Sequence, residues 1–478
     1  MSGLRLFNTL TRKKEEFIPL KDKKINLFVC GLTVYDDAHL GHAKTFINFD
    51  VIARWLRHLG FEVKYVQNIT DIDDKIIARA KERNEDPIQL ARNYEKRFME
   101  DLQAIKAKES VDEFPRSHDY IAPVGKQIQL LLDKDYAYYI DGDIYYDVKK
   151  FKDYTKLSRM KLEELEKHRI EPKEGKRNSY DFVLWKAAKP GEPTWKTAVR
   201  IKGREVALVG RPGWHIEDTA MTYEIFGPQY DVHGGANELI FPHHSNEIAQ
   251  AEAAFGIVPF VRYWLHSGVL FVEGAKMSKS LKNFVTIRQA LQRYRPEALR
   301  LQVLSTHYRK DVNYTEASIK EAEKRLSYLY IALGIFSNMP VKETDDDKLV
   351  NEYIRSFKEE FETAMNDDFN VPLALASLTR TLNSLRIFAD THQSIGKATK
   401  ESAIKEILDT AQIFGLLEDE DYRAKLPKEV AALIKERERL RKEKSFGEAD
   451  LIRDKIKEQY GLIVEDTEYG TIWYKMKV

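Results

Sequence analysis

Two short clusters of polar residues have the types and the spacing expected of groups that bind phosphate. His39-Leu40-Gly41-His42 stands where a helix should begin. The amides and dipole of a helix N-terminus favour anions, and imidazoles can add hydrogen bonds. Lys276-Met277-Ser278-Lys279-Ser280 follows a glycine at position 274, so we expect two ammonium groups on a loop that can close over a phosphate and act on it as point charges. Each cluster also has a plainer interpretation, since two histidines can simply cap a helix and Lys/Ser runs are often ordinary loops.

A second kind of chemistry is indicated by His243 and Glu247. They are four positions apart just after Pro242, so on a helix they share one face, a spacing that suits two ligands of one metal ion. The alternative is a capped helix start with solvated polar residues. Cys30 is the only cysteine, so no intramolecular disulfide can form, and we expect a reducing compartment, by default the cytoplasm.

The elements that must position the first cluster are predicted by the hydrophobic pattern. Residues 25–30 form a short apolar run typical of a buried parallel strand. Large apolar residues recur at helical spacing from Gly41 to His58, and Gly60 stands where the glycine after a helix is expected. Residues 61–66 alternate like a strand. This β-α-β unit predicts a nucleotide-binding α/β domain of the Rossmann type.

An insertion is expected to divide that domain. The pattern is helical and charged from about residue 75 to 130, and mixed, with Tyr-rich and Pro/Gly-bearing stretches, from about 137 to 205. Strand-like and Gly-rich segments return at 229–235 and 268–273, which suggests that the α/β domain resumes there. We therefore predict a catalytic domain in two halves, 1–130 and 206–314, separated by a connective insertion at 131–205.

The C-terminal part is predicted to be mostly helical. From 315 to 418 nearly every segment is typical of an amphipathic helix, which predicts a helical bundle. Residues 419–478 carry the charge-dense stretch 435–439, then a helix, then short strands at 461–464 and 471–474, so we expect a small α/β domain. A charge run is usually a solvated helix face, but the exposed basic residues here leave an RNA role open.

Bulk properties set wide limits. A length of 478 residues exceeds what one core supports and predicts roughly two to four domains. The formal net charge of +1, with 32% charged residues, means that a nucleic acid would have to meet local basic patches. The N-terminus lacks a targeting pattern, and no stretch approaches the roughly 18 apolar residues of a membrane span, so we expect a soluble chain with no membrane partner.

The two phosphate-type clusters, in this order, resemble the paired motifs of class I aminoacyl-tRNA synthetases. Four further segments narrow the resemblance to the cysteinyl-tRNA synthetase family: 28–36, 68–75, Gly213-Trp214-His215-Ile216-Glu217, and Phe241-Pro242-His243-His244-Ser245-Asn246-Glu247. The likeness runs from 7–10 to 465–473, essentially the whole chain. It departs from the family pattern at Leu40, where isoleucine is usual, and at Lys282, where glycine commonly follows the lysine-serine loop.

The resemblance implies an ATP-dependent enzyme that forms cysteinyl-adenylate and transfers cysteine to the 3′-terminal ribose of tRNA(Cys), with Mg²⁺ accompanying ATP. His39, His42, Lys276 and Lys279 would be catalytic, because negative charge builds on the phosphates as pyrophosphate leaves. Gly41, Ser278 and Ser280 would bind ATP with them. The bundle and the small C-terminal domain would bind the tRNA, and we expect a monomer.

The family's zinc is held by two cysteines, a histidine and a glutamate, and binds the substrate thiolate. Carried over position by position, its ligands fall on Cys30, Asp218, His243 and Glu247, so that Asp218 stands where the family commonly has its second cysteine. The formal ligand charge is unchanged, but a carboxylate is a harder donor than a thiolate. We expect a zinc site of lower affinity that still tells cysteine from serine, a pair that packing alone separates poorly.

Thr70, Trp214 and His215 are further candidates to line the cysteine pocket, with the alternative that Trp214 belongs only to the core. Two other functions stay open at this point. One is a relative that joins cysteine to a small amine, against which the C-terminal extension argues. The other is an inactive RNA-binding paralogue, against which the intact His39, His42, Lys276 and Lys279 argue.

Overall fold

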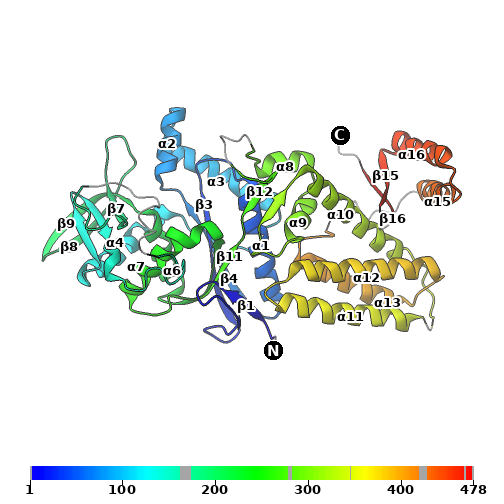
Figure 1. The fold of residues 1–478 in the computed structure, drawn as a ribbon, viewed down its shortest axis with the longest axis horizontal. Coiled ribbons are helices and arrows are strands. Elements are labelled where there is room, and N and C mark those ends of the chain that lie inside the picture. Colours follow the sequence, from blue (N-terminus) through cyan, green and yellow to red (C-terminus); the bar gives the residue numbers. More distant parts are fainter. Residues whose placement is uncertain are drawn as a thin grey trace. The chain divides into compact units, whose positions relative to one another are not determined.

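The computed structural model describes residues 3–161, 174–277, 283–344, 346–418, 428–467 and 470–475 (Figure 1). The chain divides into two compact units, Met1–Leu270 with Tyr308–Asp311, and Phe271–His307 with Val312–Val478. Among the described residues, none of the helices combines the length and the apolar character that crossing a lipid bilayer requires.

A four-stranded parallel sheet forms the centre of the first unit. Its strand order is β11 (Val261–Ser267), β10 (Tyr230–Ala236), β3 (Lys24–Thr33) and β4 (Glu62–Thr70). Helix α1 (Leu40–His58) connects β3 to β4, which confirms the predicted β-α-β unit. Because all four strands are parallel, their carboxyl ends meet at one edge, where α/β proteins usually bind ligands.

The sequence of α1 explains both of its ends. Its apolar residues, among them Phe46, Phe49 and Trp55, are buried. The helix starts after His39, whose extended backbone and side chain cap it. Its last residue is His58, Leu59 caps it, and Gly60 follows with φ of +87°, a left-handed conformation that glycine adopts without strain.

Between β4 and β10 the chain forms three helices and then an antiparallel sheet, which runs from Ala137 to Pro212 and so extends past residue 205, where we predicted the insertion to end. The helices are α2 (Asp74–Arg83), α3 (Pro87–Ala104) and α4 (Ile121–Asp133). The strands form an antiparallel sheet in the order β5 (Ala137–Ile140), β6 (Asp143–Tyr146), β7 (Phe182–Ala187), β9 (Arg204–Pro212) and β8 (Trp195–Ile201). Figure 1 shows β7, β8 and β9 gathered at one end of the first unit.

The return to the parallel sheet runs through α6 (Trp214–Phe226), β10, the short π-helical segment Ile240–His244, α7 (Ser245–Phe255) and β11. The second returning strand is therefore Val261–Ser267, and not the predicted 268–273. Within 268–273 the structure has β12 (Leu270–Val272), which pairs antiparallel with β13 (Ala275–Lys276) and joins β14 (Val312–Tyr314) in a separate small sheet.

The second unit contains the predicted bundle and the small α/β domain. After α8 (Ile287–Arg293) and α9 (Pro296–Leu304), the bundle consists of α10 (Glu316–Ser337), α11 (Asp347–Asn366), α12 (Val371–Thr391) and α13 (Lys397–Ile413). The small domain has α15 (Lys428–Lys442), α16 (Phe446–Tyr460) and the antiparallel hairpin β15 (Leu462–Thr467) and β16 (Gly470–Lys475). The buried guanidinium of Arg437 donates two hydrogen bonds, of 2.8 and 2.6 Å, to Asp466 and so joins α15 to the hairpin.

Candidate active site and metal centre

Six buried side chains of metal-ligand type converge near the carboxyl ends of the parallel strands. Each is at most 7% exposed. Cys30 lies on β3, His233 on β10 and Asp218 on α6, while the adjoining π-helical segment and α7 supply the rest. The six are Cys30, Asp218, His233, His243, His244 and Glu247, and we call them the thiol-imidazole cluster.

The structure brings together the four ligand positions predicted from the sequence. One donor atom from each of Cys30, Asp218, His243 and Glu247 lies within 4.8 Å of all the others. The Nε2 atom of His243 is 3.0 Å from Asp218 Oδ2 and 2.8 Å from Glu247 Oε1, and Cys30 Sγ is 3.5 Å from Asp218 Oδ2. His243 and Glu247 therefore face one point, as their spacing suggested.

A second set of four shares two members with the first and was missed from the sequence. Cys30, His233, His244 and Glu247 also place their donor atoms within 4.8 Å of one another. Cys30 Sγ lies 3.3 Å from His233 Nε2 and 3.2 Å from His244 Nε2. The sequence indicates these two ligands only weakly. His233 precedes two glycines at the end of a strand, and His244 directly follows His243, which was itself predicted to be a ligand.

The donors of the cluster fit a divalent cation such as zinc. The carboxylate of Glu247 is fully buried, with His243 Nε2 2.8 Å from Oε1 and His233 Nε2 3.5 Å from Oε2. Burial raises the pKa of the Cys30 thiol well above its usual range, and the carboxylates of Glu247 and Asp218 raise it further. The thiol of Cys30 and the carboxyl groups of Asp218 and Glu247 repel one another when all three are ionised, because their donor atoms lie within 4.8 Å. A bound divalent cation would offset that repulsion and favour the thiolate.

Asn68 on β4 holds two parts of this cluster in register. Its Nδ2 donates to Asp218 Oδ1 at 2.7 Å, and its Oδ1 accepts from the backbone N–H of Gly31 at 2.6 Å, next to Cys30. Only glycine fits at position 31, since a Cβ atom there would lie 1.7 Å from the Asn68 carbonyl oxygen. The sequence alone gives Asn68 no role, because that role depends on the pairing of β3 with β4.

The outer nitrogens of the two additional histidines are also engaged. His233 Nδ1 is 2.6 Å from the Tyr230 hydroxyl, and His244 Nδ1 is 2.8 Å from His266 Nε2. His266 in turn lies 2.8 Å from the hydroxyl of Thr9. Such outer contacts fix the orientation of an imidazole, which leaves the Nε2 atoms of His233 and His244 directed at Cys30.

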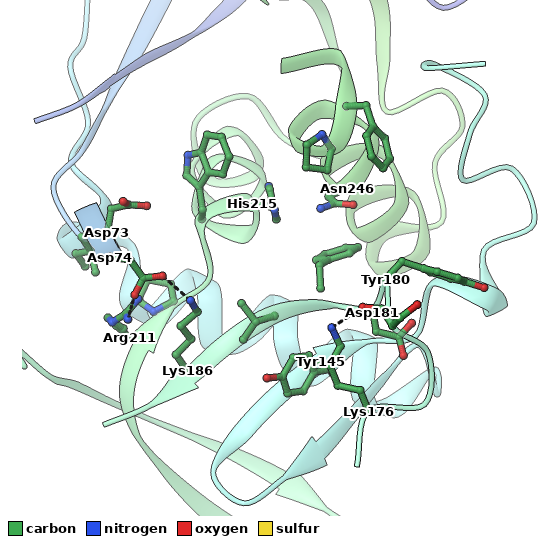
Figure 2. Close-up of a pocket in the computed structure, with 18 of the residues that line it drawn as sticks. Asp73, Asp74, Tyr145, Lys176, Tyr180, Asp181, Lys186, Arg211, His215 and Asn246 are labelled. Carbon is green, nitrogen blue, oxygen red and sulfur yellow. Dashed lines mark hydrogen bonds and ion pairs between the residues drawn. The ribbon is translucent and has the colours of Figure 1, made fainter. Parts of the chain in front are cut away.

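The three residues predicted to line a cysteine pocket lie beside the cluster in two different settings. The hydroxyl of Thr70 donates to Glu217 Oε1 at 2.7 Å and is buried. The Trp214 ring stacks on His243 with 4.2 Å between centroids, and His215 Nδ1 is 2.8 Å from His243 Nδ1. Trp214 and His215 also line a pocket of 170 Å³ (Figure 2), so Trp214 is more than a core residue.

His39 and His42 form a reciprocal cap at the start of α1. The Gly41 N–H donates to His39 Nδ1 at 3.1 Å, and the His39 N–H donates to His42 Nδ1 at 3.2 Å. The two rings stack with centroids 3.7 Å apart. Burial lowers the pKa of His39 to about 4 and that of His42 well below its usual value, so both rings are neutral near pH 7. The two histidines therefore cap the helix, as the plainer interpretation predicts. The cap uses only Nδ1 of each ring, so it is compatible with phosphate binding through Nε2.

Only part of the second phosphate-type cluster belongs to the described residues. Lys276 is exposed on β13, directly after a turn in which Gly274 has φ of +77°. Ser278, Lys279 and Ser280 lie outside the described residues. Lys276 belongs to the second unit and His39 to the first.

Three family models match consecutive parts of the chain. Residues 16–324 match the catalytic domain of class I (C) tRNA synthetases, residues 360–418 match the DALR domain, and residues 423–473 match the cysteinyl-tRNA ligase anticodon binding domain. The first of these alone covers more than half of the chain.

Cysteine–tRNA ligases of several organisms are similar to this chain over 99–100% of its length. The chain is 45% identical to cysteine–tRNA ligases of Thermococcus gammatolerans and Pyrococcus abyssi, with 100% of each chain covered, and 43% identical to that of Aquifex aeolicus, with 99% of each covered. Among solved structures, methionyl-tRNA synthetase of Mycobacterium tuberculosis in complex with methionyl-adenylate has a TM-score of 0.55 at 15% identity, covering 82% of this chain and 89% of that one. This structural likeness confirms the class I fold, and the matches confirm the resemblance stated from the sequence: the chain belongs to the cysteine–tRNA ligase family of class I aminoacyl-tRNA synthetases.

Proposed function

We propose that this protein activates cysteine with ATP and transfers it to the 3′-terminal ribose of tRNA(Cys). In the first step a carboxylate oxygen of cysteine attacks the α-phosphorus of ATP and the bond to pyrophosphate breaks. In the second, a ribose hydroxyl oxygen attacks the acyl carbon, the bond from that carbon to AMP breaks, and the hydroxyl proton is released. The observation that carries the proposal is the thiol-imidazole cluster, buried at the strand ends of a class I catalytic domain.

Cys30, Asp218, His243 and Glu247 are our first choice for holding zinc, since they occupy the family's ligand positions. When bound, the ion would supply a Lewis acid that ionises a thiol near neutral pH and discriminates against a hydroxyl. The set built from His233 and His244 offers two imidazoles in place of the hard carboxylate of Asp218 and the imidazole of His243. Metal content after substitution of Asp218 or of His233 distinguishes these sets.

His39, Gly41 and His42 are proposed to bind ATP at the N-terminus of α1. The cap uses Nδ1 of each ring, so Nε2 is the atom that would donate to a phosphate oxygen. Lys276, Ser278, Lys279 and Ser280 are proposed to contribute from the other motif, with Mg²⁺ bound to the nucleotide. The lysines would act where charge develops in the transition state.

The division into 1–130, 131–205, 206–314, 315–418 and 419–478 remains our proposal for the functional domains. The last two would bind the tRNA, as the DALR and anticodon-binding matches at 360–418 and 423–473 support. A monomeric state and a cytoplasmic location are proposed with them, the latter because the only cysteine is Cys30.

Two assays on the purified protein test this function. Cysteine-dependent ATP–pyrophosphate exchange should occur, and total tRNA should then be charged with cysteine. Exchange without charging would instead support the ligase that uses a small amine. Absence of both would support an inactive RNA-binding paralogue and refute the proposal.

A further inference from the structure

The loop that precedes His39 carries two neighbouring carboxylates. It consists of residues 34–38, between the end of β3 and the cap of α1, and we call it the Asp36–Asp37 loop. Both carboxylate side chains are partly buried, with 19% of Asp36 and 24% of Asp37 exposed. Carboxylates so close in the chain to a proposed triphosphate site repel the ligand unless they are neutralised. Their partners therefore matter for the binding of ATP.

Each of the two carboxylates is paired with a guanidinium from a different helix. Arg97 on α3 donates to Asp37 through two nitrogens of its fork, with Nε 2.6 Å from Oδ1 and Nη2 2.8 Å from Oδ2. Arg79 on α2 pairs with Asp36. The two helices pack against each other (Figure 1). Because a bidentate pair fixes the orientation of a carboxylate as well as balancing its charge, α2 and α3 together hold the loop.

Helix α3 also contacts α1 just after the His39–His42 motif. The ring of Phe98 lies 5.4 Å from that of Phe46, and the ring of Phe46 lies 6.3 Å from that of His42, both between centroids. Phe46 and Phe98 are each at most 2% exposed, and Phe98 directly follows Arg97 in the chain. One turn of α3 is therefore in contact with the loop before the motif and with the helical turn after it.

The construction of the cap makes the direction of the two imidazoles important. Nδ1 of each ring accepts a backbone N–H, and burial lowers the pKa of both rings so that they are neutral near pH 7. The proton of each ring is then on Nε2. A neutral imidazole acts on a phosphate oxygen through a hydrogen bond and not through a full charge. Hydrogen bonds weaken steeply when they are misaligned, so the backbone around His39 must be held in place.

We propose that Arg97 is a positioning residue for ATP. Through its bidentate pair with Asp37 it fixes the Asp36–Asp37 loop, and with the loop it fixes the direction in which His39 offers Nε2 to a phosphate oxygen. Arg79 acts in the same way through Asp36. The inference rests on the proposed function and deepens it, because nucleotide binding then depends on side chains of α2 and α3 that lie outside the motif.

A double-mutant cycle on the pair of Arg97 and Asp37 tests this role, read by cysteine-dependent ATP–pyrophosphate exchange at varied ATP concentration. Arg97→Gln, Asp37→Asn and the double variant should each lower kcat/KM for ATP by about tenfold, and by no more than the roughly 100-fold that a displacement of about 1 Å can cost. The three losses should agree within about twofold, because each variant removes the same contact. The KM for cysteine should stay unchanged.

Arg97→Lys separates positioning from charge balance. Lysine keeps the positive charge beside Asp37 but has no planar fork, so it should recover only part of the loss seen in Arg97→Gln. Full recovery would show that the charge alone suffices, and the positioning role would be refuted.

Arg116→Gln is the matched control. Arg116 also pairs with a carboxylate, with its Nη2 2.5 Å from Oε1 of Glu95, and its side chain is 43% exposed, the same fraction as that of Arg97. Its partner lies on α3 and not in the Asp36–Asp37 loop. We expect Arg116→Gln to have the ATP kinetics of the unsubstituted protein, even if its melting temperature falls as far as that of Arg97→Gln.

Four results would overturn the role of Arg97. They are additive losses in the double variant, a normal kcat/KM for ATP in Asp37→Asn, a loss in Arg116→Gln equal to that in Arg97→Gln, and a KM for cysteine that rises together with the loss for ATP. Failure of the unsubstituted protein to catalyse exchange would refute the proposed function instead.

Discussion

Replacing Asn68 by leucine is the perturbation that tests the proposed metal site most directly. The change removes hydrogen bonds of 2.7 Å to Asp218, 3.3 Å to Thr70 and 2.6 Å from the Gly31 N–H. The N–H of Gly31 and Oδ1 of Asp218 would then lack this hydrogen-bond partner. Each buried polar group left without its partner costs about 1–3 kcal/mol of stability. The free energy of unfolding should therefore fall by roughly 2–6 kcal/mol.

The zinc affinity should fall as well. An outer partner that orients a ligand is typically worth 10-fold to 100-fold in metal affinity. Competition for zinc with a chromophoric chelator measures this quantity, and urea unfolding of the metal-free protein measures the stability.

Gln67→Leu is the matched control on the same strand. Gln67 is fully buried one residue away, its Nε2 makes no hydrogen bond, and its Oε1 accepts one long bond of 3.5 Å from Tyr65. We expect zinc affinity to be unchanged in Gln67→Leu. If Asn68→Leu lost stability and yet bound zinc as tightly as this control, the carboxamide would not orient Asp218 and the reasoning would be wrong.

Four further predictions concern single residues. Asp218→Cys should raise zinc affinity on the order of tenfold in the same competition assay, because sulfur is the softer donor; an unchanged affinity would mean that the His233 and His244 set holds the ion. Gly31→Ala should cost more than about 4 kcal/mol in urea unfolding, since its Cβ would lie 1.7 Å from a backbone oxygen; a smaller loss would show that β3 and β4 can separate there. Burial lowers the pKa of Lys44 to about 8, so between pH 8 and the usual pKa of lysine the unfolded chain binds more protons than the folded one. The free energy of unfolding of the unsubstituted protein, minus that of Lys44→Met, should therefore rise with pH over this interval. If this difference instead fell with pH, the amine of Lys44 would not be destabilised by burial. Lys279→Ala should lower pyrophosphate exchange by about two orders of magnitude with cysteine binding unchanged, whereas an equal loss of cysteine affinity would argue against a transition-state contact.

Local patterns predicted the elements well where apolar runs and end signals coincide. The strand at 25–30, the helix after His39 and the glycine at position 60 all agree with the structure. The strand Val261–Ser267 was missed because Arg262 and His266 interrupt its apolar pattern. His266 is nevertheless buried, since it contacts His244 and Thr9, and those partners are known only once the chain has folded.

The site shows the same limit. His243 and Glu247 could be paired from their spacing, and Cys30 and Asp218 from the family resemblance. His233 and Asn68 could not, because each acts through a neighbour on another strand or helix: Cys30 for the histidine, and Asp218 for the asparagine. Ligands that are close in sequence can be predicted from their spacing. Ligands that are brought together by the order of strands in a sheet can be predicted only when that order is known.

The reciprocal cap at His39 and His42 has a consequence for mutagenesis. An alanine at either position would remove an imidazole from the proposed ATP-binding site and would also remove a cap from the first turn of α1, so a loss of turnover would have two causes. His39→Asn separates them, because the asparagine carbonyl oxygen can accept from the Gly41 amide as Nδ1 does while offering no ring nitrogen to a phosphate. If His39→Asn keeps its melting temperature but no longer forms the adenylate, the imidazole ring of His39 takes part in adenylate formation and does more than cap the helix.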